Sequence, residues 1–550
     1  MTGAPPSSPR DRLAAPALWL LGLLVAFHPA LASGFAVLQI PPGDPRLVEY
    51  VLEHGWRWLT GAPLHGAFWS PPVFHPARNV GAYTDTLVGS APLYWVWRAL
   101  GVETGAAFQL WIMACLSASF GAAHLFFRRC AGFTPWVAAG AAFFFGFGIQ
   151  RLASFTSPQL YPIFAAALAL YALGRALEGE RTPRWIALFY AALALQTWSA
   201  FYPTFFLLLL LAALALAALP FAEARGRLAR LVRENPGALA AGALAYALAV
   251  APMLARHLAA SRELGFREYG EVRWALPTLA SWLFPGKDHL FYGGLAQHPW
   301  FQFESFASQH SNGLGFLTSA VCAMGLWVGR RRALVRVAVV AAAGLVLVAT
   351  RPPGGGDSLW HAVYAVLPGA KAIRYPARIG LFLPLLGGLG VGLLATHLVA
   401  RGRAAWALAL CALCIAEQLH RLSGEGEGEY RAAIRRAAAE VDPACDGFVL
   451  TVEDARPGGG PFSRTHAAAM WVGLEAGVPT LNGWYGNFPP GWHLYSVDVT
   501  GPNVAASLRE AISRWIAERG LDDARVQRVR VPAAWFPWHR AASRADARGR

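Results

Sequence analysis

Apolar runs about as long as a lipid bilayer is thick recur along most of this chain. A helix needs roughly 20 apolar residues to cross the hydrocarbon core. Of the 550 residues, 55% are hydrophobic and only 14% are charged. The pattern predicts an α-helical polytopic membrane protein, with crossing segments near Leu13–Ile40, Ala106–Phe127, Trp136–Gln150, Gln159–Leu173, Trp185–Thr197, Phe201–Leu219, Ala238–His257, Gly313–Val328, Ala333–Ala349, Ile379–Val399 and Ala404–Leu419.

Arginines gather in the short connections between these runs, for example at Arg128 and Arg129 and at Arg330 to Arg332. The positive-inside rule places such connections in the cytoplasm. They all fall on that side only if Thr86–Gly101, a shorter aromatic stretch, does not cross. The predicted topology has about eleven spans, with a cytoplasmic N-terminus and an extracytoplasmic C-terminus in the inner (plasma) membrane. Topology therefore accounts for the formal charge of +15, and we expect no nucleic-acid partner.

The first extracytoplasmic loop, residues 41–101, opens with an amphipathic pattern. From Pro45 onward, apolar residues recur at spacings of three and four, which is one face of a helix. The other face carries ionisable residues. A helix of this kind lies in the membrane interface with its ionisable side toward water. The apolar face is Leu47, Val48, Val51, Leu52, Trp56 and Leu59, and the polar face is Arg46, Glu49, Tyr50, Glu53, His54 and Arg57.

Asp44 stands directly before this helix, and two interpretations of it are open. An Asp followed by a Pro is a good N-cap and first-turn pair. A carboxylate at this place could also serve as a catalytic acid or base, or as a ligand of a divalent metal ion, and one residue can do both jobs. The other candidate catalytic residues are Glu49, Glu53, His54 and Asp85. Glu49 and Glu53 can equally be ordinary solvated residues of the helix.

Basic residues on the same side of the membrane are candidates for binding a phosphate group. Arg151 lies in a polar turn between two spans, and Lys287 and His289 lie in a second long extracytoplasmic loop, residues 258–312. Lys371, Arg374 and Arg378 precede the Ile379 span at spacings of three and four, so a helical stretch would place them on one face. Pro376 disfavours a continuous helix there. Basic residues at this depth can also simply anchor the chain at the lipid headgroups.

The composition turns polar after residue 420, so residues 1–420 form the predicted transmembrane part. The stretches GFVLTV and VQRVRV indicate strands, and the patterns at Tyr430–Val441 and Val504–Arg519 indicate helices. Residues 421–550 are therefore predicted to form a small extracytoplasmic α/β domain. Its loop Asn482–Trp492 is rich in Gly, Pro and aromatic residues, and is expected either to touch carbohydrate or to pack on the membrane surface.

These features together resemble the membrane glycosyltransferases of the GT-C superfamily, which include protein mannosyltransferases, the lipid A aminoarabinose transferase and oligosaccharyltransferase catalytic subunits. The resemblance rests on an acidic residue just after the first span, on the juxtamembrane element Ala91-Pro92-Leu93-Tyr94-Trp95, and on a second span that opens GAAFQLW. By this resemblance Asp44 corresponds to the catalytic or metal-binding acid of the first loop. The acidic pair common in the superfamily is here Asp44-Pro45-Arg46, so the second acid would be Glu49, Glu53 or Asp85, or is missing.

The resemblance implies transfer of a sugar from a polyprenyl-phosphate donor to a glycan, lipid or protein acceptor at the extracytoplasmic face. A carboxylate can take the proton of the acceptor, and positive charge can stabilise the leaving lipid phosphate. The alternative is a non-enzymatic protein, either a transporter of lipid-linked saccharides or a cell-envelope assembly protein. Transporters tend to have repeated halves, whereas this chain shows no internal repeat, so we favour the enzyme.

Overall fold

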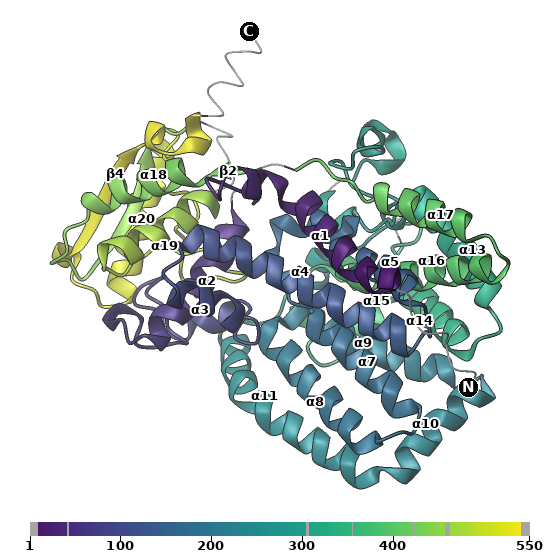
Figure 1. Cartoon of the computed structure of the whole chain (residues 1–550). Coiled ribbons are helices and arrows are strands. Elements are labelled where there is room, and N and C mark those ends of the chain that lie inside the picture. The colour runs from purple at the N-terminus through teal and green to yellow at the C-terminus, as the bar shows by residue number, and fades with distance from the viewer. Residues whose placement is uncertain are drawn as a thin grey trace.

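The computed structural model describes residues 9–40, 43–303, 307–354, 356–422, 424–456 and 463–540. It has a large helical body and a smaller α/β part, built from the end of the chain, on one side of that body (Figure 1). The helices of the first loop lie between the two parts, beneath the α/β part. The site described below forms in this region.

A helix occupies each of the eleven ranges predicted to cross the membrane. Seven of the helices described are long and apolar enough to span a bilayer, and three more apolar helices are shorter. The chain is thus a multi-pass membrane protein, while the number of spans and the side on which each terminus lies remain predictions. The helices are α1 (Pro9–Ala32), α4 (Thr104–Arg129), α5 (Pro135–Phe147), α7 (Phe164–Leu177), α8 (Thr182–Ser199), α9 (Phe201–Ala218), α11 (Pro236–Leu264), α13 (Phe316–Gly329), α14 (Ala333–Ala349), α16 (Leu383–Ala400) and α17 (Ala404–Ala416).

Small residues let α13 and α16 approach each other closely. A Cβ atom added to Gly325 of α13 would lie 1.8 Å from the carbonyl oxygen of Gly390 in α16, so no larger side chain fits at this crossing. Close contact between backbones at small residues is a common way for membrane helices to associate, because lipid gives no hydrophobic driving force between them. The glycine-rich segment from Gly387 to Gly392 therefore places α16, and the residues just before it, firmly within the bundle.

The first loop contains α2 (Asp44–Leu59) and α3 (Pro92–Ala99). The 8 residues of α3 would extend only about 12 Å, far less than the roughly 30 Å of a hydrocarbon core. A helix of this length does not reach across the core, which agrees with the prediction that Thr86–Gly101 stays on one side.

The ionisable face of α2 does not point to water, and that prediction is wrong. Arg46 and Glu49 are 1% and 0% exposed, and Glu53 and His54 are also buried. The α/β part covers Arg46 and Glu49, because Arg46 contacts Glu425 and Glu427, and Arg431 pairs with Glu49. The helix α3 covers Glu53, which accepts hydrogen bonds from Tyr94 and Arg98.

The α/β part has its own hydrophobic core, which also takes in first-loop residues such as Phe74 and Tyr83. Its two predicted strands are present as β3 (Gly447–Glu453) and β4 (Val526–Pro532), which pair in parallel. The predicted helices are present as α18 (Glu427–Ala439) and α20 (Pro502–Glu518), and α19 (Ser463–Ala476) packs against β3 and α2. A short antiparallel pair, β1 (Val37–Leu38) with β2 (Glu425–Gly426), ties this part to the end of α1.

Candidate functional site

Asp44 is the first residue of α2, and its position depends on the glycine before it. Gly43 is the N-cap residue and has φ +116°, a conformation that residues with a Cβ atom rarely adopt. The interpretation of Asp44 as the N-cap is therefore wrong, and no side chain caps this helix. The carboxylate is instead free to point away from the helix, where its Oδ1 accepts a hydrogen bond of 2.8 Å from the indole Nε1 of Trp484.

Trp484 belongs to the Gly/Pro/aromatic loop of the α/β part, so two segments from opposite ends of the chain meet at Asp44. Two aromatic residues of the loop, Tyr485 and Trp492, are buried against Phe74 of the first loop. Burial raises the pKa of Asp44, while the hydrogen bond from Trp484 and the charge of Arg378 act in the opposite direction. A carboxylate in this setting is a stronger base than one in water.

Asp85 is the second partly buried carboxylate of this region. Its Oδ1 accepts a hydrogen bond of 2.5 Å from the backbone N–H of Phe201, the first residue of α9. Burial raises the pKa of Asp85 to about 6, against the opposing effects of that hydrogen bond and of Arg378. The charge of Arg378 lowers the pKa of both carboxyl groups, so this guanidinium lies within electrostatic range of Asp44 and of Asp85.

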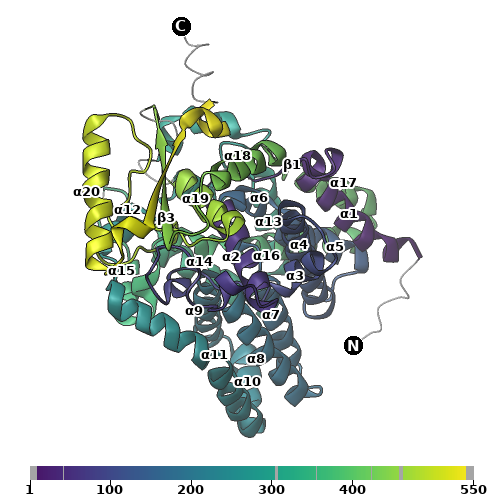
Figure 2. The ribbon, with the colours of Figure 1, turned by 90° about the vertical axis from the view of Figure 1, so that its left-hand side faces the viewer.

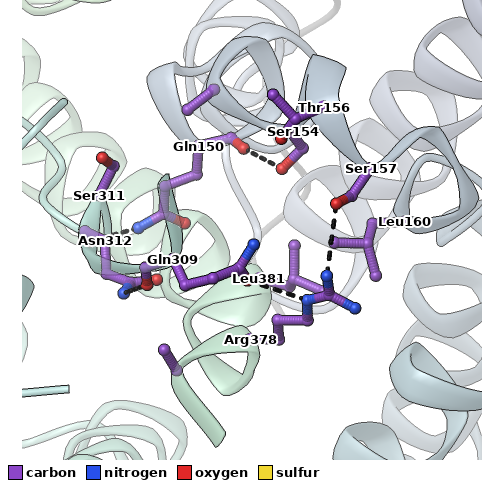
Figure 3. Close-up of a pocket in the computed structure, with 12 residues that line it drawn as sticks. Gln150, Ser154, Thr156, Ser157, Leu160, Gln309, Ser311, Asn312, Arg378 and Leu381 are labelled. Atoms are coloured by element: carbon purple, nitrogen blue, oxygen red, sulfur yellow. Dashed lines mark hydrogen bonds between the residues drawn. The ribbon is translucent and has the colours of Figure 1, made fainter. Parts of the chain in front are cut away.

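Arg378 sits in η10 (Pro376–Phe382), directly before α16, and its guanidinium is held from several sides. It donates to Oε1 of Gln309 at 3.0 Å and to Oγ of Ser157 at 3.3 Å (Figure 3). Its Cζ lies 4.6 Å and 4.7 Å from the ring centroids of Tyr202 and Tyr375. The two rings and two polar partners fix the cation in one place, as an anion-binding site requires.

A small polar cavity of about 40 Å³ lies beside this guanidinium (Figure 3). Its walls combine amides and hydroxyls, including those of Gln150, Ser157 and Asn312, with a few apolar side chains, and among the described residues that line it Arg378 alone is charged. The side-chain oxygen of Gln150 is buried in the described structure without a hydrogen-bond partner. The sequence does give a signal for the Gln150–Gln159 wall, a polar stretch between two spans. It gives none for Gln309 and Asn312, which are inconspicuous members of a long loop.

A larger apolar cavity of about 310 Å³ begins next to the same arginine. Ile379 and Phe382, which follow Arg378 in η10, line one end of it. The cavity then continues between α7, α9, α14 and α16. Arg378 therefore stands at a boundary, with a polar cavity on one side and an apolar one on the other.

The other basic residues before α16 do not share a helical face with Arg378. A short turn, η9 (Ala370–Ala372), and η10 are separated by extended residues, so there is no continuous helix here, as expected from Pro376. Arg374 pairs with Glu271 at 3.3 Å, and the Nζ of Lys371 lies 5.6 Å from the ring centroid of Phe266. Both stay near Arg378 along the chain, but other residues hold their side chains.

Of the three further basic candidates, Arg151 and His289 are buried and hydrogen-bonded to the backbone, whereas Lys287 is exposed. The guanidinium of Arg151 is fully buried and donates to the carbonyl oxygens of Phe145, Leu160 and Leu381. His289 is buried, with Nε2 2.7 Å from the carbonyl oxygen of Glu417 and Nδ1 accepting from two backbone N–H groups. Lys287 is exposed on the long loop. The structure thus brings neither Arg151 nor His289 to Asp44 as a free ligand.

Helix geometry separates Asp44 from the other ionisable residues of α2. At 1.5 Å per residue, Glu49, Glu53 and His54 lie about 7, 13 and 15 Å along the axis from Asp44. Glu53 pairs with Arg57 and Arg98, and His54 contacts His65 and the carbonyl oxygen of Phe68. Burial lowers the pKa of His54 to about 4, so this imidazole is neutral at physiological pH. Of the other candidate acids, Asp85 is the one whose pKa, like that of Asp44, is affected by the charge of Arg378.

The residues around Asp44 do not fit a divalent metal ion. Nowhere in the described part of the chain do three His, Cys, Asp or Glu side chains come together in a way that could hold one. Arg378 lies close enough to Asp44 to act on its charge, and a fixed cation opposes the binding of another.

No protein-family model matches the chain, and no curated protein matches it in sequence. Among solved structures, the chain is similar to the oligosaccharyltransferase of Archaeoglobus fulgidus in complex with Zn and sulfate, at 12% identity and a TM-score of 0.49 over 86% of this chain and 62% of that one. It is also similar to the arabinofuranosyltransferase AftD from Mycobacteria, at 17% identity and a TM-score of 0.44 over 82% of this chain and 30% of that one.

A third similar structure is ArnT from Cupriavidus metallidurans, at 14% identity and a TM-score of 0.33 over 86% of this chain and 84% of that one. The chain thus spans less than two thirds of the length of the oligosaccharyltransferase and of AftD. Membrane glycosyltransferases are also the class of protein that the sequence motifs resemble. At identities this low and TM-scores below 0.5 they establish no activity for this chain, which has to be argued from its side chains.

Proposed function

We propose that the protein is a membrane glycosyltransferase that moves a sugar from a polyprenyl-phosphate donor to an acceptor at the extracytoplasmic face. The observation that best supports this is the place of Arg378, between a polar and an apolar cavity and beside two carboxylates. A lipid-linked sugar has the same order of parts, with an apolar chain, a phosphate and a polar ring.

In this proposal the phosphate of the donor binds at Arg378. The prenyl chain enters the apolar cavity past Ile379 and Phe382, and the sugar lies toward Asp44 and Asp85. A guanidinium suits this role because it stays charged and can bind phosphate oxygens with two N–H groups. Its hydrogen bonds to Gln309 and Ser157 and its contacts with two tyrosine rings hold it in place before the substrate arrives.

In the chemical step one proton is transferred, one covalent bond forms and one breaks. An acceptor hydroxyl or amine attacks the anomeric carbon, and the new bond forms as the bond from that carbon to the phosphate oxygen breaks. The electron pair of the broken bond stays on the lipid phosphate, where Arg378 stabilises the charge. Asp44 takes the proton of the acceptor, for which its raised pKa suits it. Asp85 faces the same arginine and orients the acceptor.

The test is release of polyprenyl phosphate from polyprenyl-phosphate sugars by the purified protein in lipid nanodiscs. Asp44→Asn keeps a side-chain oxygen that can accept the hydrogen bond of Trp484, but it loses the basicity of the carboxylate. We expect its turnover to fall on the order of a hundredfold or more, with an unchanged unfolding temperature. Asp288→Asn, at an exposed carboxylate of the second long loop, is the matched control. Full activity of Asp44→Asn would contradict the mechanism, and wild type without turnover on any donor would favour a transporter or assembly protein.

A further inference from the structure

The apolar cavity that Ile379 and Phe382 line is also lined by residues of a short helix between α9 and α11. Apart from Glu178 and Arg227, every residue that lines the cavity is apolar. Its wall on α14 runs from Ala333 to Val346, which corresponds to about 20 Å along that helix. The cavity is therefore long enough to hold an extended hydrocarbon chain along much of the bundle.

The far end is formed by α10 (Ala222–Glu234), which lies across the ends of the helices that wall the cavity and contacts α7, α9 and α14. Both views place α10 at the end of the molecule away from the α/β part (Figures 1 and 2). Ala224 and Leu228 of α10 line the cavity. They are four residues apart and so share one face of the helix.

Charged groups stand at this same end. Arg227 pairs with Glu223 at 2.7 Å, and Glu178 pairs with Arg175. An apolar chain that continued past Leu228 would have to displace water from these ion pairs, which is unfavourable. The cavity thus extends from Ile379, the residue after Arg378, to α10, where Ala224 and Leu228 form a floor edged by charged groups.

We propose that α10 limits the length of the prenyl chain that the protein accepts, with Ala224 and Leu228 as the residues that meet the end of the chain. The inference rests on the proposed function, because it takes the lipid phosphate to bind at Arg378. The occupant is the prenyl chain of the donor, since Ile379 continues directly from Arg378 into the cavity. A short chain ends before the floor, whereas a long chain reaches it.

The experiment measures binding of two lipids, farnesyl phosphate and undecaprenyl phosphate, to the purified full-length protein by native mass spectrometry. Ala224→Trp and Leu228→Trp each place a larger side chain at the floor of the cavity and so shorten the space for the prenyl chain. We expect each variant to lose about tenfold or more in affinity for undecaprenyl phosphate, the effect of displacing about two buried methylene groups, with unchanged affinity for farnesyl phosphate. Val232→Trp places the same side chain on α10 at a residue that is 53% exposed and should change neither affinity.

Two further variants separate the role of α10 from that of the phosphate site at Arg378. Leu228→Ala deepens the floor and should raise the preference for undecaprenyl phosphate, which tests the inference even if the Trp variants fail to fold. Arg378→Gln should weaken both lipids alike. If only Arg378→Gln fails to act, the phosphate site of the proposed function is wrong while the role of α10 stands. Equal effects of the α10 variants on both lipids, or a retained phospholipid that neither polyprenyl phosphate displaces, would overturn the inference.

Discussion

The indole Nε1 of Trp484 donates a hydrogen bond of 2.8 Å to the carboxylate of Asp44, although the two residues are 440 positions apart in the chain. The contact joins the loop of the α/β part to the first residue after the N-cap of α2. A second link supports it, because Arg267 of the second long loop donates to the carbonyl oxygen of Gly486 in the same aromatic loop. Three segments that are distant in sequence thus meet at the aromatic loop, and one of its residues holds the carboxylate.

Replacing Trp484 by Phe removes the donor and keeps an aromatic ring. A hydrogen bond to the charged form lowers the pKa of a carboxyl, so its loss should raise the pKa of Asp44 further. We expect kcat/KM to fall about tenfold, in keeping with the loss of a hydrogen bond to a charged group. The acidic limb of the pH–rate profile should move to higher pH. Trp300→Phe, at an exposed tryptophan, is the control, and an unmoved profile in Trp484→Phe would show that the contact is only structural.

The stability and the activity of the protein should both change near pH 6 as Asp85 loses its proton. Its pKa is raised from 3.8 to about 6, so the folded state binds its proton more tightly than the unfolded state does. The stability that this proton contributes is therefore present below about pH 4 and is lost as the pH rises to about 6. If the carboxylate form orients the acceptor, activity should rise over the same interval.

Asp85→Asn should remove both effects. Its unfolding temperature, compared with that of wild type at each pH, should lack the decline between about pH 4 and 6. The activity that remains should lose its dependence on a group with a pKa near 6. Thermal unfolding and initial rates in the same buffers would measure both, and a variant that keeps the wild-type profile would exclude Asp85 from the reaction.

The membrane helices could be predicted because their signal is local. A run of apolar residues as long as the bilayer is thick has few alternatives to a crossing helix. The prediction that Thr86–Gly101 does not cross used a signal from the whole chain instead, the distribution of arginines among the connections. Arg378 and Asp85 were also within reach, since a cation before a span and a carboxylate in the first loop stand out in an apolar chain.

The burial of the polar face of α2 could not be predicted, because its partners lie far along the chain. Arg46 contacts Glu425 and Glu427 across 379 and 381 positions. An amphipathic helix with an ionisable face looks the same in sequence whether that face meets water or a complementary set of charges. The same holds for Trp484, whose role depends on how the α/β part docks onto the first loop.

Glu49 should matter for stability and little for turnover. It is fully buried between Arg46, at 2.8 Å, and Arg431. Replacing it by Ala removes one of the carboxylates that compensate Arg46 and Arg431, while Glu425 and Glu427 remain, so the cost should stay below the about 3–5 kcal/mol of a buried charge that loses its whole partner. We expect a lower unfolding temperature for Glu49→Ala and a kcat close to wild type in the protein that stays folded. Glu429→Ala, at an exposed ion pair on α18, should change neither. A large loss of kcat in stable Glu49→Ala protein would return this residue to the catalytic candidates.

Two substitutions of Arg378 separate the effect of its positive charge from that of its hydrogen-bonding geometry. Lys keeps a positive charge at this place, but its ammonium cannot bind Gln309, Ser157 and two phosphate oxygens in the planar fork of a guanidinium. If Arg378 binds the phosphate of the donor and also stabilises it as a leaving group, Arg378→Lys should lower kcat by about tenfold, and Arg378→Gln by about a hundredfold or more. The dependence on salt separates the two variants further, since only the Lys variant should keep an ionic contribution to donor binding.

Arg374→Gln is the matched control, because that guanidinium pairs with Glu271, and it should stay within a few-fold of wild type. Equal activity of the Lys and Gln variants would show that charge at this position has no part in the reaction.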